Sequence, residues 1–343
     1  MSESKIIAVV GATGAQGGGL ARVILEDADS RFSVRAITRN ANSDAARELA
    51  ASGAEVVEAD LDVLDSLIAA FKGAYGAYCV TNFWEHFSPG KEQAQAHNLA
   101  VAARSASLSH VIWSTLEDTR RWIPLDDNRM PTLMERFKVP HFDAKGEANY
   151  LFTETGVPTT FLLTSYYWEN LISFGMGPKP GPDGTLEFIL PMADQKMPGI
   201  AVDDIGACAY GVFKAGAECV GQTIGIAGEI LTGEEMAQAL GRALGQSVRY
   251  NAVSPTAYRS FDFPGADDLG NMFQFKQEFA DDFCGARSVE QSRALAGDPH
   301  ARVPERACQT LGAFLGLGLG HAGISHGFAS WRKNFLHMGC ICT

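Results

Sequence analysis

Residues 11–19 read GATGAQGGG and follow directly on the apolar run KIIAVV at residues 5–10. The glycine spacing is Gly11-x-x-Gly14-x-x-Gly17. In a dinucleotide-binding corner the first glycine permits a tight turn, the second admits the pyrophosphate, and the third lets the helix pack on the strand. Backbone N–H groups and the helix dipole then hold the phosphates. Because this triplet follows a strand and opens a helix, it predicts a dinucleotide site, with a purely structural turn as the alternative.

The rest of the first half repeats this strand-then-helix pattern. Short β-branched runs alternate with helical stretches, which is typical of parallel βαβ units. The fold class that follows is α/β, namely a Rossmann-type doubly wound parallel sheet with a smaller α+β second domain. The strands that we expect are residues 5–11, 32–39, 54–60, 74–81, 108–115 and 159–164.

The pattern changes after about residue 168, where loops rich in proline and glycine appear. We expect residues 199–216 to return one more strand and helix to the main sheet, and residues 221–228 to form a late strand. The glycines near the end of the chain favour a flexible tail. The domains that we expect are a dinucleotide-binding domain (1–168 and 198–228), a smaller domain (169–197 and 229–310) and the tail (311–343).

Composition and charge restrict the classes of partner and compartment. A formal net charge of −12 argues against a nucleic-acid backbone as partner. Seven scattered cysteines without a C-x-x-C pair fit reduced thiols, no metal site and a cytoplasmic location, with the nucleus as a second compartment. The amino terminus runs straight into a strand, which predicts no signal peptide, and no apolar stretch reaches the about 18 residues of a membrane span. Cys340–Thr343 match a C-a-a-X signal only weakly, because threonine is not a favoured last residue.

The end of the second strand bears on the choice of cofactor. An NAD site usually offers an acid there to the ribose 2′-hydroxyl, whereas a 2′-phosphate requires a cation. Residues 37–40 read ITRN, with no acid before Asp44. The planar guanidinium of Arg39 can bind a phosphate, so the sequence favours NADP(H). A solvated arginine at a strand end is the alternative.

Further along, the chain carries the motifs VTNFWE (80–85), HFDAKGE (141–147), YYWENL (166–171) and FPGADDLGNMFQF (263–275). With these motifs and its glycine corner, the chain resembles the NmrA-like family, a branch of the atypical short-chain dehydrogenase/reductases, from about residue 5 to about residue 280. Within that family it is most similar to the NADP(H)-binding redox-sensor members.

The resemblance implies a cofactor, NADP(H), in the cleft of the Rossmann domain. By position it puts the pyrophosphate at the glycine corner, the 2′-phosphate at Arg39 and the nicotinamide ribose beside Lys145, with residues 167–170 closing over the nicotinamide. A lysine that redox-sensor members carry after VTNFWE falls near Ala94 in this register. The cofactor-binding residues so implied are Gly11, Thr13, Gly14, Ala15, Gln16, Gly17, Arg39, Asp60, Leu61, Thr81, Asn82, Phe83, Lys145, Tyr167 and Asn170.

Short-chain reductases place a tyrosine four residues before a lysine, so that the phenol can exchange a proton with the substrate oxygen. The match Tyr210–Lys214 lies after the sixth strand, on the wrong helix, and we interpret it as a core tyrosine and a surface lysine. On the helix after the fifth strand stand His141 and Lys145, so histidine occupies the tyrosine position.

The candidate catalytic residues are therefore His141, Lys145 and Ser114. Histidine can act as an acid, since its ordinary pKa lies near 6.5. Asp143 stands between the histidine and the lysine and either orients His141 or faces solvent. The alternative is that these side chains shape the pocket without proton chemistry, as the lack of dehydrogenase activity in the redox-sensor relatives implies.

Two functions follow from these observations. The first is an NADP(H)-binding regulatory protein of the redox-sensor kind, whose cofactor occupancy changes its conformation and its binding to a protein partner. The alternative is an NADPH-dependent oxidoreductase that acts on a small carbonyl or enone. The partners are thus NADP(H) and a regulatory protein, a homodimer stays open, and neither nucleic acid nor a membrane is expected.

Overall fold

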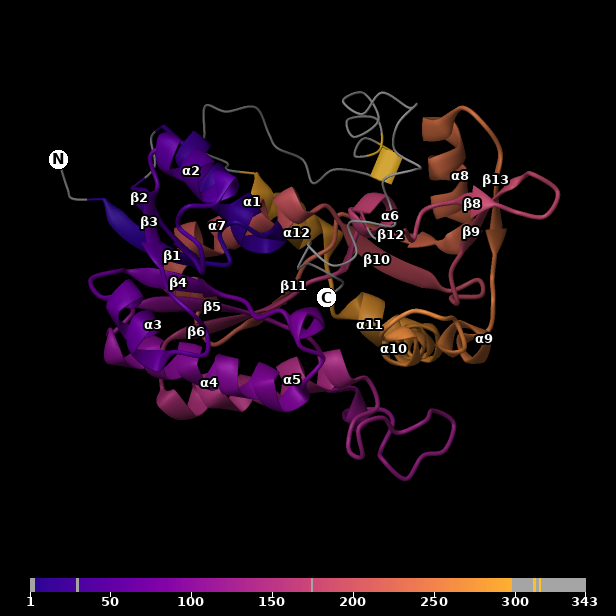
Figure 1. Cartoon of the computed structure of the whole chain (residues 1–343), viewed down its shortest axis with the longest axis horizontal. Helices are drawn as coiled ribbons and strands as arrows, with labels where there is room; N and C mark the ends of the chain where they lie inside the picture. Colours follow the sequence, from indigo (N-terminus) through magenta and orange to yellow (C-terminus); the bar gives the residue numbers. More distant parts are fainter. Residues whose placement is uncertain (1–3, 29–30, 174, 298–310, 313–314, 316–343) are drawn as a thin grey trace.

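The computed structural model describes residues 4–28, 31–173, 175–297, 311–312 and 315. Figure 1 shows two parts side by side, a large sheet covered by helices on both faces and a smaller part with two short sheets. The expected fold class, a Rossmann-type α/β sheet with a smaller second region, is confirmed.

In the described chain the main sheet has seven parallel strands, in the order β11-β6-β5-β4-β1-β2-β3. The order runs outward in both directions from the β1–β4 pair, which defines a doubly wound sheet and puts a crevice at the carboxyl ends of these two strands. The strands are β1 (Lys5–Val10), β2 (Phe32–Thr38), β3 (Glu55–Glu58), β4 (Gly76–Cys79), β5 (His110–Thr115), β6 (Thr159–Leu163) and β11 (Thr223–Gly225).

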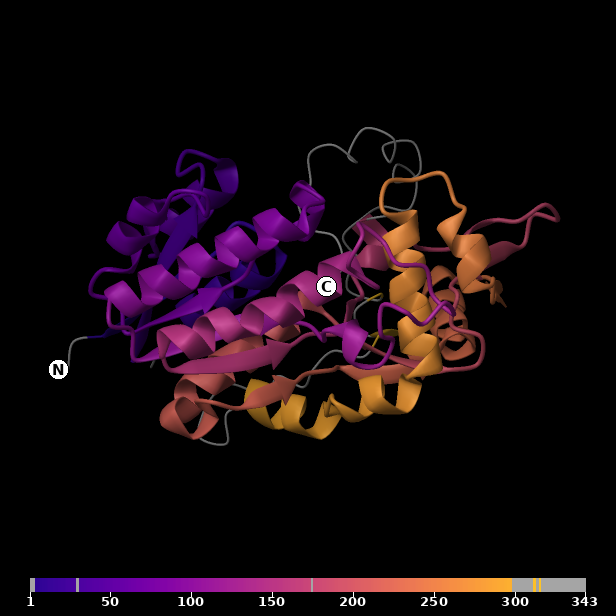
Figure 2. The ribbon, with the colours of Figure 1, turned by 90° about the horizontal axis from the view of Figure 1, so that it is seen from below.

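Helices bury both faces of this sheet. In β1, Ile7 and Val9 pack on one side while Ala8 and Val10 pack on the other, because successive strand residues point to opposite faces. Figure 2, seen from the second side, shows α4 and α5 running next to each other. The first face carries α1 (Ala15–Glu26), α2 (Asp44–Ala51), α7 (Val202–Ala215) and α12 (Val289–Ala296), and the second carries α3 (Leu64–Phe71), α4 (Pro89–Ser105) and α5 (Pro140–Thr155).

Helices α1 and α7 approach so closely that their backbones touch. A Cβ atom on Gly206 would lie 2.2 Å from the carbonyl carbon of Gly19, and one on Gly19 would lie 2.8 Å from the carbonyl oxygen of Val202. A side chain at either glycine would force the helices apart. This contact fixes α1, and with it the glycine corner, relative to α7.

The smaller part is built around two three-stranded sheets, ordered β12-β10-β7 and β13-β9-β8. Its strands are β7 (Tyr166–Tyr167), β8 (Lys179–Pro180), β9 (Leu186–Ile189), β10 (Lys196–Ile200), β12 (Glu229–Thr232) and β13 (Val248–Asn251). Its helices are α6 (Asn170–Ser173), α8 (Gly233–Leu244), α9 (Pro255–Arg259), α10 (Ala266–Glu278) and α11 (Ala280–Gly285). The segments that follow β4, β5 and α7 contain short 3₁₀ turns, which are η1 (Phe83–Glu85), η2 (Thr119–Arg121) and η3 (Gly216–Cys219).

One expectation about the main sheet is wrong. The strand expected at the start of residues 199–216 belongs to β10, which pairs with β12 and β7 in the small sheet. The position next to β6 in the main sheet is taken instead by β11, the late strand expected within residues 221–228. The helix of the same segment, α7, does return to the main sheet.

The first described residues of the expected tail are packed. Leu311 and Leu315 are buried in the core cluster of the smaller part, and the N–H of Leu311 donates to Glu229 Oε2 at 2.8 Å. The rest of 311–343, including the C-a-a-X cysteine Cys340, lies outside the described residues apart from residue 312. The domain boundaries stay a prediction. Within the described ranges, no helix combines the length and apolarity that a membrane crossing needs.

Candidate nucleotide-binding site

A pocket of about 400 Å³ opens at the carboxyl ends of β1 and β4, where the strand order reverses. This is the place where doubly wound sheets bind their ligands. Its lining comes from the segments that follow the first four strands, together with the first turns of α4 and a tyrosine of β7. The lining residues are Val10, Gly11, Thr13, Gly14, Ala15, Gln16, Gly17, Ile37, Thr38, Arg39, Asn40, Ser43, Ala59, Asp60, Leu61, Asp62, Val80, Thr81, Asn82, Glu85, Lys91, Gln95 and Tyr167.

The glycine corner has the geometry that its sequence predicts. Gly11 has φ +63°, a left-handed conformation that favours glycine, and a Cβ on Gly17 would lie 2.5 Å from the carbonyl oxygen of Gly11. Helix α1 begins after Gly14 without a side-chain cap and without an acid in its first turn. Its positive end therefore faces the pocket, where an anion is stabilised.

The structure gathers most of the predicted cofactor-binding residues around this pocket. Of that set, only Phe83, Lys145 and Asn170 do not line it, and all three are buried. Contact of the lining residues with a nucleotide stays a prediction.

Arg39 stands at the mouth of the pocket and is paired with an acid. It follows β2, its side chain is 62% exposed, and its Nη1 forms an ion pair with Glu85 Oε1. Glu85 is the last residue of η1, which follows β4. The acid that the sequence lacks after β2 is thus supplied from a segment more than forty residues later, a contact that no local pattern reports.

A second cation lines the pocket and was missed by the sequence analysis. Lys91 Nζ lies 2.8 Å from Asp62 Oδ2, and Gln95 donates to the other oxygen of Asp62 at 2.9 Å. Lys91 sits in the first turn of α4, three positions before Ala94, where the family register put the expected lysine. A shift of three residues in that register would have placed the expected lysine at Lys91.

Ser114 belongs to a buried network centred on Gln16. The amide oxygen of Gln16 accepts from the Ser114 hydroxyl at 2.8 Å and from the hydroxyl of Tyr78, while its amide nitrogen donates to the Tyr167 hydroxyl. Burial raises the pKa of Tyr78, so this phenol stays protonated. Ser114 therefore holds Gln16 and Tyr167 at the pocket wall.

Lys145 is committed to an internal acid. Its Nζ lies 2.8 Å from Glu92 Oε1 and donates to the Thr81 hydroxyl at 2.7 Å and to the Thr81 carbonyl at 3.0 Å. Burial alone would raise the pKa of Glu92. The charge of Lys145, hydrogen bonds from Lys145 and Thr81, and the nearby His86 at 3.4 Å outweigh it and lower this pKa to about 2. Glu92 is therefore ionised, and Lys145 reaches the pocket only through Thr81.

His141 is also paired with a distant acid. Its Nδ1 lies 2.6 Å from Oδ1 of Asp268, which comes from α10 in the smaller part. Nε2 of His141 is buried and makes no hydrogen bond within the described chain, and the ring is flanked by those of Trp84 and Phe142 at centroid distances of 4.7 and 4.8 Å. The carboxylate thus fixes the ring orientation and holds a proton at Nδ1.

Both roles considered for Asp143 are wrong. It is fully buried, and its carboxylate accepts from Thr119 N and Oγ1 and from the backbone N–H of Lys138 and Val139. Burial raises its pKa to about 6, which the hydrogen bonds from Thr119, Val139 and Lys138 oppose. Asp143 organises the loop between β5 and α5, and Asp268 orients His141 in its place.

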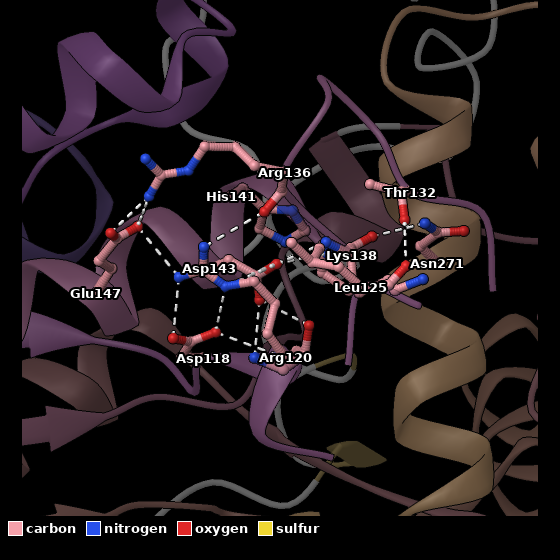
Figure 3. A network of polar contacts seen from close by, with 12 residues as sticks. Asp118, Arg120, Leu125, Thr132, Arg136, Lys138, His141, Asp143, Glu147 and Asn271 are labelled. Atoms are coloured by element: carbon pink, nitrogen blue, oxygen red, sulfur yellow. Dashed lines mark hydrogen bonds and ion pairs between the residues drawn. The ribbon is translucent and has the colours of Figure 1, made fainter. Parts of the chain in front are cut away.

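Figure 3 shows how that loop is fastened on two sides. Arg120 donates to Glu147 of α5 at 3.1 Å, and Arg136 donates to the same carboxylate at 2.6 Å. On the other side, Asn271 of α10 donates to the carbonyl of Lys138 at 2.6 Å. The loop therefore ties the main sheet's α5 to α10 of the smaller part.

Each of the three candidate catalytic residues has its own hydrogen-bond partners, and a catalytic role for them stays a prediction. Ser114 binds Gln16, Lys145 binds Glu92 and Thr81, and His141 binds Asp268. The Tyr-x-x-x-Lys match at residues 210–214 is structural, as predicted, because Tyr210 is buried, donates to Asp27 at 2.6 Å and lies under the ammonium of Lys214.

The chain matches known proteins over most of its length. The model of the NmrA-like family matches residues 3–299. The chain is 30% identical over 291 residues to the NmrA-like family domain-containing oxidoreductase FrzB of Cladobotryum sp, which covers 79% of this chain and 84% of that protein. Among solved structures, the fold resembles NmrA, a negative transcriptional regulator, in complex with NADP, with a TM-score of 0.72, 24% identity and coverage of 92% and 95% of the two chains. It also resembles the NADPH-dependent quinone oxidoreductase QOR2 of Escherichia coli complexed with NADPH, with a TM-score of 0.66, 22% identity and coverage of 91% and 99%.

The buried ion pair between Lys145 and Glu92 can be tested by its contribution to stability. We expect Glu92→Gln to lower the free energy of unfolding by about 3–5 kcal/mol, because the ammonium of Lys145 loses its anion while staying buried. The double substitution Glu92→Gln/Lys145→Met removes both charges and should recover part of this loss. Urea unfolding followed by circular dichroism measures all three proteins.

The same pair predicts a pH dependence. Folding lowers the pKa of Glu92 from its ordinary 4.5 to about 2, so its contribution is fully present above pH 4.5 and is lost as the pH falls toward 2. Across that window the wild type should lose more stability than Glu92→Gln. If the free energies of unfolding of the two proteins fell in parallel with pH, the ion pair would not contribute to stability as predicted.

Proposed function

The chain belongs to the NmrA-like family, and on that premise we propose that it is an NADP(H)-binding regulatory protein whose nucleotide occupancy changes its conformation. One observation supports this proposal above the others, namely the unbroken series of contacts that leads from Arg39 at the pocket to α10 of the smaller part. The relatives named oxidoreductases make a reductase the second candidate.

The pocket fits a dinucleotide with two phosphate positions. The diphosphate would lie at the uncapped amino end of α1, against backbone that no side chain obstructs at Gly11, Gly14 and Gly17. The 2′-phosphate would meet Arg39, whose guanidinium is exposed at the pocket mouth. The NADP and NADPH complexes of the two structural neighbours agree with this choice of ligand.

The contact series begins with the Arg39–Glu85 ion pair, which attaches the pocket mouth to η1. Within η1, the ring of Trp84 lies 4.7 Å from that of His141, which is in turn bound to Asp268. A Cβ on Gly265, at the start of α10, would lie 2.7 Å from Trp84. Because η1 touches both the pocket and α10, a nucleotide that moves η1 also changes what α10 contacts.

A regulatory role requires that the nucleotide prefer one arrangement of η1 over another, since equal affinity for both would shift nothing. A 2′-phosphate that takes Arg39 from Glu85 supplies such a preference. The chemistry expected of a short-chain reductase is less well supported, because histidine replaces the tyrosine and Lys145 is held by Glu92.

The reductase candidate rests on a different observation, the free Nε2 of His141. With Asp268 holding the proton on Nδ1, a second proton on Nε2 would make His141 an acid for a substrate oxygen. When bound, NADPH would supply a hydride to the carbonyl carbon or to the β-carbon of an enone. The proton from Nε2 to the substrate oxygen would then give the alcohol, or the enol that isomerises to the ketone. Solvent would then return the proton to the imidazole.

We expect Arg39→Ala to weaken NADPH binding by about 1.5–3 kcal/mol and to leave NADH binding nearly unchanged, because only NADPH carries the 2′-phosphate. Isothermal titration calorimetry measures both. Arg47→Ala is the matched control, since Arg47 is equally exposed and paired with Asp44 but does not line the pocket. Equal losses for both nucleotides would contradict the place of the 2′-phosphate.

We expect saturating NADPH to change amide hydrogen exchange in residues 83–87 and 266–278. In Asp268→Ala the change in residues 266–278 should shrink, because the hydrogen bond to His141 is lost. The control Asp267→Ala, which replaces the exposed neighbouring acid, should leave this change intact. Hydrogen-exchange mass spectrometry measures these segments. Bound NADPH with no change in residues 266–278 would remove the regulatory proposal.

The reductase candidate predicts that NADPH absorbance falls in the presence of a quinone, aldehyde or enone, and that His141→Gln stops this turnover while NADPH still binds. A broad panel without turnover at full NADPH occupancy would exclude it.

A further inference from the structure

The mouth of the pocket is more acidic than a site for a 2′-phosphate requires. Its charged lining residues are two cations and three carboxylates, namely Arg39, Lys91, Asp60, Asp62 and Glu85. Lys91 is already bound to Asp62. Arg39, which follows β2 where a 2′-phosphate is expected, is likewise bound to an acid, Glu85.

The Arg39–Glu85 pair bridges the two sides of the glycine corner. Arg39 follows β2 and Glu85 follows β4, and these strands flank β1 in the sheet. Their side chains are 62% and 43% exposed, so a ligand can reach both. Neither side chain makes a second hydrogen bond within the described residues, and Glu85 also interacts with the charge of Lys91.

The two ends of this pair recognise different nucleotides. A guanidinium binds a 2′-phosphate, whereas a carboxylate accepts a hydrogen bond from a 2′-hydroxyl and repels a phosphate. In NADP(H) binding, the phosphate would have to displace Glu85 from Arg39 and then lie near its negative charge. In NAD(H) binding, the ribose hydroxyl could donate to Glu85 while the ion pair stays closed.

We propose that Glu85 determines the nucleotide specificity of this pocket: it competes with the 2′-phosphate for Arg39 and accepts the 2′-hydroxyl of NAD(H). The pocket consequently binds both nucleotides, and its preference for NADP(H) is smaller than Arg39 alone would give. The inference rests on the proposed nucleotide site. It adds that Glu85 weakens the binding of NADP(H) and strengthens the binding of NAD(H).

The test is isothermal titration calorimetry of NADPH and NADH with the full chain and with Glu85→Gln, which keeps the shape and removes the charge. NADPH should bind about three- to tenfold more tightly to the variant, on the scale of an exposed ion pair, and NADH more weakly by a similar factor. Glu55→Gln is the control, since it removes an exposed carboxylate that pairs with Arg35 and does not line the pocket. Thermal unfolding of each variant checks that the fold is intact.

The outcomes separate this inference from the proposed function. If neither nucleotide binds the wild type, the nucleotide site itself is wrong. If both bind and Glu85→Gln shifts them in the same direction or not at all, the role of Glu85 is wrong while the site stands. In an Arg39→Gln background the gain in NADPH affinity should largely vanish, and an undiminished gain would overturn the competition for Arg39.

Discussion

The whole molecule is arranged around the close approach of backbone to backbone at its first bend. Gly17 has no side chain, and a Cβ atom there would lie only 2.5 Å from the carbonyl oxygen of Gly11. The positive φ of Gly11 turns the chain so that α1 can start at this short distance. Helix α1 is then aimed across the point where the strand order reverses. Because α1 also touches α7 at glycines, this helix is positioned with its amino end at the carboxyl end of β1.

The sequence predicted what local patterns encode and failed where distant segments meet. Alternating apolar strands and helices predicted the main sheet, and the glycine spacing predicted the corner, because both depend on neighbours in the chain. The partner of His141 lies 127 residues away and that of Arg39 lies 46 away, so neither has a signal in spacing. The assignment of β10 failed for the same reason, since its strand character was visible but its neighbours were not.

Residue identity at the two positions typical of a short-chain reductase says little about their use here. Lysine is kept at 145, but a buried carboxylate from α4 neutralises it, and histidine at 141 is bound by a carboxylate from α10. Both acids are buried, so each pair is costly to break and firmly sets the position of the elements that it joins. These pairs join α5 to α4, whose first turns line the nucleotide pocket, and to α10 of the smaller part.

The connection between β6 and β11 has a consequence for how the chain is made. The carboxyl-terminal strand of the main sheet, Thr223–Gly225, follows β6, Thr159–Leu163, only after roughly sixty residues of the small sheets and α7 have been synthesised. At about 5–20 residues per second, a ribosome leaves the edge of β6 without its partner for several seconds. An unpaired parallel strand edge is prone to aggregation. The edge of β6 in the nascent chain therefore stays without its native partner until the small sheets and α7 have been synthesised.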